Sequence, residues 1–138
     1  MKGRSINGGI VQAEAIVTNQ MFGFWGGVDT NTGIIIDERH ELFGQSIKGK
    51  VFVFPEGRGS TVGAAVILEL VRCGNAPAAM VNRQSEGILA AGAILADKFY
   101  NVSIPLVDSL DSDPVSVIKT GDLVEVNGDT GEVLVIKK

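Results

Sequence analysis

The sequence predicts a single α/β domain with β-rich ends around a central layer in which strands and helices alternate. Three observations lead to this prediction. The chain has 138 residues, its two ends are rich in alternating and β-branched residues, and two long apolar helical patterns occupy its middle. A chain of this length holds one hydrophobic core, so residues 1–138 are expected to form one domain without an internal repeat.

The first 55 residues are expected to be mostly β-structure. Residues 9–18 place Gln12 and Glu14 on one side of an otherwise apolar strand. Residues 34–36 form a short β-branched pattern after a turn signal, and residues 50–54 form another strand that Pro55 ends.

The middle of the chain predicts a strand–helix–strand–helix–strand succession that begins at residues 50–54. The first helix is expected over residues 62–72, where Gly74 stops it, and the second from residue 85 to about residue 99. A short strand over 78–81 lies between them. After them comes a strand over 102–107, which Pro105 should restrict to a sheet edge or a bend.

The C-terminal end predicts a β-hairpin. Residues 121–126 and 132–136 are strand patterns, and the Asn-Gly-Asp-Thr-Gly segment between them has the composition of a tight turn.

Both predicted helices are apolar on nearly every side. Only Glu69 and Arg72 carry charge in the first helix, and the second has no charge between Glu86 and Asp97. Such helices are buried on more than one side. Either the domain itself covers them, or a partner subunit covers part of their surface, and the pattern leaves both explanations open.

Composition excludes several classes of protein. Apolar residues make up 45% of the chain and charged residues 20%, so it is not a disordered protein. A single cysteine excludes a disulfide framework and a self-contained zinc or iron–sulfur site, so this chain is expected to hold no metal. The net charge of −4 argues against nucleic acid as a partner. No apolar run is long enough to span a membrane and the start lacks a secretory pattern, so we expect a cytoplasmic protein that does not bind membranes.

The strongest local signal for chemistry is the Gly-Arg-Gly-Ser-Thr segment at 57–61, between a predicted strand and a predicted helix. Amides near Ser60 would be the unpaired first N–H groups of that helix, and with the helix dipole they form an anion site. Arg58 adds a planar fork that suits a carboxylate or phosphate. An ordinary capped β–α turn explains the pattern equally well.

A nucleotide-binding domain is a rival interpretation of the same turn. Gly57, Gly59 and Gly63 have a spacing close to that of dinucleotide-binding loops, and Asn82 and Arg83 end the next strand, where a ribose phosphate of NADP would be bound. The segment is not a Walker A loop, because it lacks the Gly-Lys-Ser/Thr ending.

Other polar or aromatic residues are given structural interpretations. His40, between charged neighbours, is expected on the solvated surface, and Cys73 is expected to be a small core or interface residue. Trp25 is expected to be a core anchor beside paired glycines, and a substrate-facing loop is the alternative interpretation. The acidic residues after the last central strand are expected to form a solvated loop. They are Asp108, Asp111 and Asp113.

Four segments together resemble one family: residues 24–29, 57–61, 74–83 and 104–108. In this order, and over nearly the whole chain, they are similar to the small swivel subunit of the aconitase X family. The resemblance implies the swivelling β/β/α domain as the fold. It also implies a hydro-lyase that is active only with a large cysteine-bearing catalytic subunit. That subunit would hold a [4Fe–4S] cluster as Lewis acid, and this chain would bind no cofactor itself.

The resemblance also implies a substrate class, a small phosphorylated hydroxy acid. Two-subunit archaeal members of the family dehydrate 5-phosphomevalonate to trans-anhydromevalonate 5-phosphate in isoprenoid biosynthesis. Relatives that are often fused into one chain dehydrate cis-3-hydroxyproline, which is the alternative substrate. A non-catalytic adaptor that only docks a partner is a further alternative.

For the site, the resemblance implies that Ser60 accepts the substrate proton. Arg58 and the amides of Gly59 and Thr61 would hold the charge of the substrate or of the serine alkoxide. More distant aconitases present a Gly-Ser-Ser-Arg turn on the swivel domain, whereas here Arg58 precedes Ser60. The role of Ser60 therefore transfers more directly than that of Arg58.

Overall fold

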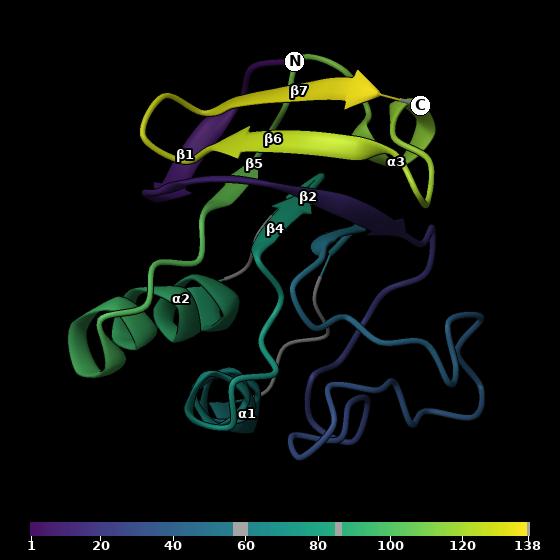
Figure 1. The fold of residues 1–138 in the computed structure, drawn as a ribbon, viewed down its shortest axis with the longest axis vertical. Helices are drawn as coiled ribbons and strands as arrows, with labels where there is room; N and C mark the ends of the chain where they lie inside the picture. The colour runs from purple at the N-terminus through teal and green to yellow at the C-terminus, as the bar shows by residue number, and fades with distance from the viewer. Residues whose placement is uncertain (57–60, 85–86, 138) are drawn as a thin grey trace.

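The structure is a computed structural model that describes residues 1–56, 61–84 and 87–137. The described residues form a curled seven-stranded sheet and three helices (Figure 1). The elements in chain order are β1 (Arg4–Asn7), β2 (Ile10–Val17), β3 (Val51–Phe54), α1 (Thr61–Arg72), β4 (Ala79–Asn82), α2 (Gly87–Tyr100), β5 (Leu106–Asp108), α3 (Pro114–Val117), β6 (Leu123–Asn127) and β7 (Glu132–Lys137).

The sheet has the order β1-β5-β4-β3-β2-β6-β7. Strands β2, β3, β4 and β5 run parallel to one another, whereas β1 is antiparallel to β5, and β6 is antiparallel to both β2 and β7. The predicted central layer and the C-terminal hairpin are therefore confirmed.

Residues 1–3, which precede β1, connect the two outer strands of the sheet, β1 and β7. Lys2 forms an antiparallel bridge with Glu132 of β7, and the Gly3 amide donates to the Gly131 carbonyl at 2.8 Å. The sheet therefore curls until residues 1–3, which lead into β1, are hydrogen-bonded to β7 and to the turn before it, which leaves less unpaired backbone at its edges.

Alternating residues of the strands separate two hydrophobic clusters. Side chains such as Val51, Val53 and Val81 pack inside the curled sheet with the β6–β7 hairpin. Their neighbours Phe52 and Phe54 face the other way and pack against α1 and α2, which lie side by side on that face (Figure 1). This alternation is the period-two pattern of strands that are buried on both faces.

The connection between β2 and β3 is long and covers the helix-side cluster beside α1. Residues 34–36, which were expected to form a strand, make only isolated bridges, between Val28 and Ile35 and between Ile34 and Ser46. The connection is nevertheless well packed, because Phe22, Phe24 and other apolar side chains of it are buried.

Of the two positions expected for the strand with Pro105, a sheet edge or a bend, the sheet edge is wrong, and residues 102–105 of the predicted strand lie outside β5. Strand β5 begins directly after the proline and pairs with β4 on one side and β1 on the other. Pro105 lacks an N–H but still accepts a hydrogen bond, from the Met80 amide at 2.9 Å. The covering strand β1 was not predicted.

The two long helices differ in how much of their surface is covered. Among the described side chains of α1, only Ala65 and Arg72 are exposed. The second half of α2 instead exposes Ile94, Phe99 and Tyr100. The expectation of burial on more than one side is therefore confirmed for α1, while α2 keeps an apolar surface that this chain does not cover. No helix within the described ranges has the length and hydropathy needed to cross a membrane.

Candidate functional site

The carboxyl ends of the parallel strands lie along one edge of the sheet. Helix α1 follows β3 and α2 follows β4, so both helices begin at this edge. Ligands of open parallel α/β sheets bind outside the carboxyl ends of the strands. The candidate site is therefore sought at this edge.

The predicted site residues Arg58, Gly59 and Ser60 lie outside the described residues. Thr61 is the first residue of α1. The structure thus gives the two points between which the predicted turn runs, at Glu56 and at Thr61.

The residues that follow β3 are hydrogen-bonded to the segment after β4 and to the segment after β2. The Pro55 carbonyl accepts from the amides of Arg83 at 3.0 Å and Gln84 at 3.3 Å, and the Glu56 carbonyl accepts from the Phe22 amide at 3.3 Å. These bonds fix the segment that leads into the predicted turn to the end of β4 and to the segment after β2.

Arg83 forms a two-point ion pair at this edge. Its Nε donates to Asp113 Oδ1 at 2.9 Å and its Nη2 to Asp113 Oδ2 at 3.0 Å, and Nη2 also donates to Asn19 Oδ1 at 3.0 Å. Hydrogen bonding to Arg83 holds the pKa of Asp113 below its ordinary value. Asn82, beside it, is fully buried and its amide donates to the Phe54 carbonyl at 3.0 Å. Both residues that the nucleotide interpretation required are thus held in contacts within the chain, which disfavours that interpretation.

The three acidic residues at the end of β5 and after it have different environments. Asp108 is fully buried and takes two hydrogen bonds from Arg4, at 2.9 and 2.7 Å, so its assignment to a solvated loop is wrong. Asp111 is exposed as expected, and Asp113 caps α3. Within the described residues no group of three or more His, Cys, Asp or Glu side chains could hold a metal ion.

His40 was expected on the solvated surface, and this is wrong. Its side chain is only 7% exposed, and the ring packs edge-on against Phe22 with the centroids 5.5 Å apart. Its Nδ1 accepts a hydrogen bond from the Leu42 amide at 3.1 Å. The charged neighbours in sequence concealed this burial, because the turn at His40 directs its ring inward while the adjacent charged side chains face solvent.

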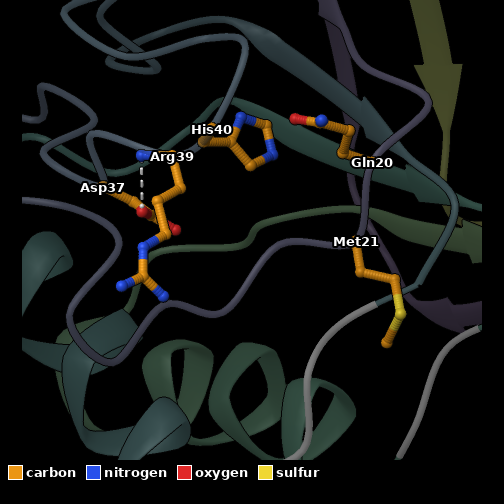
Figure 2. A pocket seen from close by; sticks show the side chains of 5 residues that line it. All are labelled: Gln20, Met21, Asp37, Arg39 and His40. Carbon is orange, nitrogen blue, oxygen red and sulfur yellow. Dashed lines mark hydrogen bonds between the residues drawn. The ribbon is translucent and has the colours of Figure 1, made fainter.

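His40 lines a cavity of about 510 Å³ at the carboxyl ends of β2 and β3 (Figure 2). The other lining residues are Gln20, Met21, Asp37 and Arg39. Figure 2 shows the His40 ring extending from its loop toward Gln20. This cavity was not predicted, because the two segments that line it are distant in sequence and meet only in the folded chain.

Two further residues have informative environments. Trp25 is 66% exposed, so the expectation of a core anchor is wrong; Phe22 and Phe24 fill the core beside it. Cys73 is half-buried at the end of α1 and its thiol donates to Glu69 at 3.5 Å, so it is not a core residue, and its role at an interface stays a prediction.

Comparison with known proteins gives one consistent result. The family model described as the aconitase X swivel domain matches residues 1–135. A phosphomevalonate dehydratase small subunit of Methanocaldococcus jannaschii is 49% identical, over 100% of this chain and 98% of its own length. One from Methanosarcina acetivorans is 45% identical, over 99% of this chain and 91% of its own. A crystal structure of Thermococcus kodakaraensis aconitase X in its holo-form superposes with a TM-score of 0.89 at 46% identity, over 99% of this chain and 97% of that one.

Proposed function

The chain belongs to the aconitase X swivel-domain family, and from this premise we propose that it is the small subunit of a phosphomevalonate dehydratase. The observation that carries the proposal is the similarity to curated small subunits of that enzyme, at 45–49% identity over nearly their whole length. The reaction removes water from 5-phosphomevalonate and gives trans-anhydromevalonate 5-phosphate.

The proposal includes a large partner subunit. The relatives are named small subunits, which implies a larger companion in each of those enzymes. An iron–sulfur cluster requires several cysteine thiolates, whereas this chain has one cysteine, whose thiol is hydrogen-bonded to Glu69. The residues present therefore do not fit such a cluster, and we assign the [4Fe–4S] cluster and its chemistry to the partner.

Within this chain we propose Ser60 as the acceptor of the substrate proton. Dehydration of a 3-hydroxy acid requires loss of a weakly acidic C–H proton beside a carboxylate, and a serine hydroxyl is a weak base unless its alkoxide is stabilised. Helix α1 begins at the next residue, Thr61, and its first turn contains no acidic residue. The positive end of the helix dipole therefore favours negative charge at this position without a competing carboxylate.

The neighbours of Ser60 have supporting roles in the proposal. Arg58 and the amides of Gly59 and Thr61 hold the charge of the substrate or of the alkoxide. The bonds that fix Pro55 and Glu56 to the adjacent segments support this arrangement, because they restrict where the turn can begin.

Reconstitution tests the proposal. The chain is co-expressed with candidate cysteine-bearing large subunits from archaea, the cluster is rebuilt anaerobically, and dehydration of 5-phosphomevalonate and of cis-3-hydroxyproline is compared. We expect turnover of 5-phosphomevalonate by the complex and none by this chain alone. Turnover of cis-3-hydroxyproline only would reject the proposed substrate.

Two control measurements address the other classes of function. Titration of the chain with NADP is expected to show no binding, and binding would favour the nucleotide interpretation. A complex that assembles but dehydrates neither acid would favour a non-catalytic adaptor.

A further inference from the structure

His40, which lines the cavity, has a buried ring nitrogen without a hydrogen-bond partner among the described residues. Nδ1 of His40 accepts from the Leu42 amide, so in the neutral ring the proton resides on Nε2. Nε2 is buried and makes no hydrogen bond to any of the residues that the structure describes. A buried donor without a partner is costly, and such groups in native proteins normally have an acceptor from a ligand or from water.

A second, independent feature of the cavity is its set of polar groups. Arg39 is exposed along one wall and forms no ion pair within the described part of the chain. Asp37 lies beside it and accepts from the Arg39 amide at 3.0 Å. On the opposite side, Gln20 accepts from the Glu41 amide at 2.9 Å, which leaves its own amide nitrogen as a donor (Figure 2).

These groups fit a particular ligand chemistry. The guanidinium of Arg39 attracts an anionic group, the carboxylate of Asp37 accepts from a hydroxyl, and His40 Nε2 and the Gln20 amide donate to further oxygens. A cavity of about 510 Å³ is within the usual range for a small-molecule site. A hydroxy acid carries all of the complementary groups, whereas a simple inorganic anion lacks the hydroxyl.

The location connects the cavity to the proposed turn. Phe22, next to the lining residue Met21, donates its amide to Glu56, directly before the Gly-Arg-Gly-Ser segment. We propose that the cavity formed by Gln20, Asp37, Arg39 and His40 binds a small hydroxy acid, with Arg39 holding its anionic group and His40 donating to one of its oxygens. The identification of this acid with the dehydratase substrate rests on the proposed function.

Nuclear magnetic resonance of His40 gives a direct test, because it is the only histidine in the chain. Chain labelled with ¹⁵N, alone and in complex with the large subunit, is titrated with 5-phosphomevalonate, with mevalonate and with inorganic phosphate. We expect 5-phosphomevalonate to shift the ring Nε2 signal and to slow exchange of its proton. A comparable shift with mevalonate assigns the carboxylate end of the acid to the cavity, and a shift with inorganic phosphate assigns the phosphate end.

Variants separate a binding role from a structural one. Arg39 is exposed, so the Arg39→Gln variant should fold normally. We expect this variant to raise the Kd for 5-phosphomevalonate about tenfold. Lys48→Gln is the matched control, because it removes the same charge from an exposed position of the same connection outside the cavity lining. In the complex, Arg39→Gln should raise KM about tenfold and leave kcat nearly unchanged.

Several results would overturn the proposal. One is the absence of any His40 shift with the three ligands, both in the chain and in the complex. Another is a shift caused by the large subunit alone to which the acid adds nothing, since a partner side chain would then fill the cavity. Normal dehydration with an unchanged KM for Arg39→Gln would reject the cavity but keep the proposed function. Binding of 5-phosphomevalonate without dehydration would keep the cavity and reject the proposed function.

Discussion

Asp113 holds two neighbouring elements together at the carboxyl edge of the sheet. Its carboxylate pairs with Arg83 after β4 and accepts from the Val115 amide at 3.2 Å as the N-cap of α3. Asparagine is an equally good N-cap, so Asp113→Asn removes the charge and keeps the cap. The substitution therefore isolates the ion pair.

The ion pair predicts a pH-dependent stability. Because Arg83 lowers the pKa of Asp113 in the folded chain, the pair stabilises the fold above the pKa of the unfolded chain. This contribution is lost as the pH falls through the lowered pKa. We expect Asp113→Asn to reduce the free energy of unfolding by about 0.2–1 kcal/mol near pH 6, with a smaller difference below about pH 4.

Urea denaturation at pH 6 and pH 3 measures this difference. Asp97→Asn serves as control, because Asp97 is exposed on α2 and its carboxylate forms no ion pair within the described residues. A difference for Asp113→Asn that stays constant over this pH range would show that Arg83 is not its cause.

Single residues were the part of the molecule that the sequence predicted least well. His40, Trp25 and Asp108 were each assigned from their neighbours in sequence, and all three assignments were wrong. Phe22 packs on His40, and Arg4 pairs with Asp108 from the far end of the chain. Burial at such positions depends on which distant segments contact the side chain, and local pattern does not contain that information.

At the scale of elements, Gly131 closes the β6–β7 turn against the N-terminus. Its φ is +85°, and a Cβ atom added there would lie 2.2 Å from the Gly3 carbonyl oxygen. Gly121, before β6, also has a positive φ, +96°, but a Cβ there would have no atom within 4 Å. A comparison of alanine variants at the two glycines therefore separates the cost of backbone strain from the cost of steric contact.

We expect Gly121→Ala to reduce the free energy of unfolding by about 1–2 kcal/mol, which is the cost of the left-handed conformation alone. Gly131→Ala should cost clearly more, since it must also displace the N-terminal segment at Gly3, which is hydrogen-bonded to the turn. Thermal and urea denaturation of the two variants give the comparison. Equal losses would mean that the contact between the turn and the N-terminus does not stabilise the fold.

Elements with a strong local signal were predicted correctly. The helix ending before Gly74, the strands on either side of it and the C-terminal hairpin all follow from periodicity and turn residues. Strand β1 was not predicted, because it has only four residues without a clear apolar alternation and is stabilised by pairing with β5. Helix α3 was not predicted either. Asp113-Pro114 is a signal for a helix N-terminus, but the helix is a single turn.

At the scale of the whole molecule, the curled sheet is what brings the site together. Its parallel strands β2 to β5 place the start of α1, the Arg83–Asp113 pair and the His40 cavity at the same edge. The order of strands and the contact of residues 1–3 with β7 depend on pairing between distant segments, which periodicity does not predict. The resemblance of four separate segments to one family supplied the overall fold instead.

The role of Ser60 as proton acceptor is measured most directly by the turnover of the assembled dehydratase with Ser60→Ala in this chain. We expect kcat for 5-phosphomevalonate to fall about 10²- to 10⁴-fold, because the proton acceptor is lost, while the subunits still assemble and KM changes little. Ser112→Ala, exposed near the same edge, should keep normal turnover. A kcat near that of the unmodified complex for Ser60→Ala would show that Ser60 is not the proton acceptor.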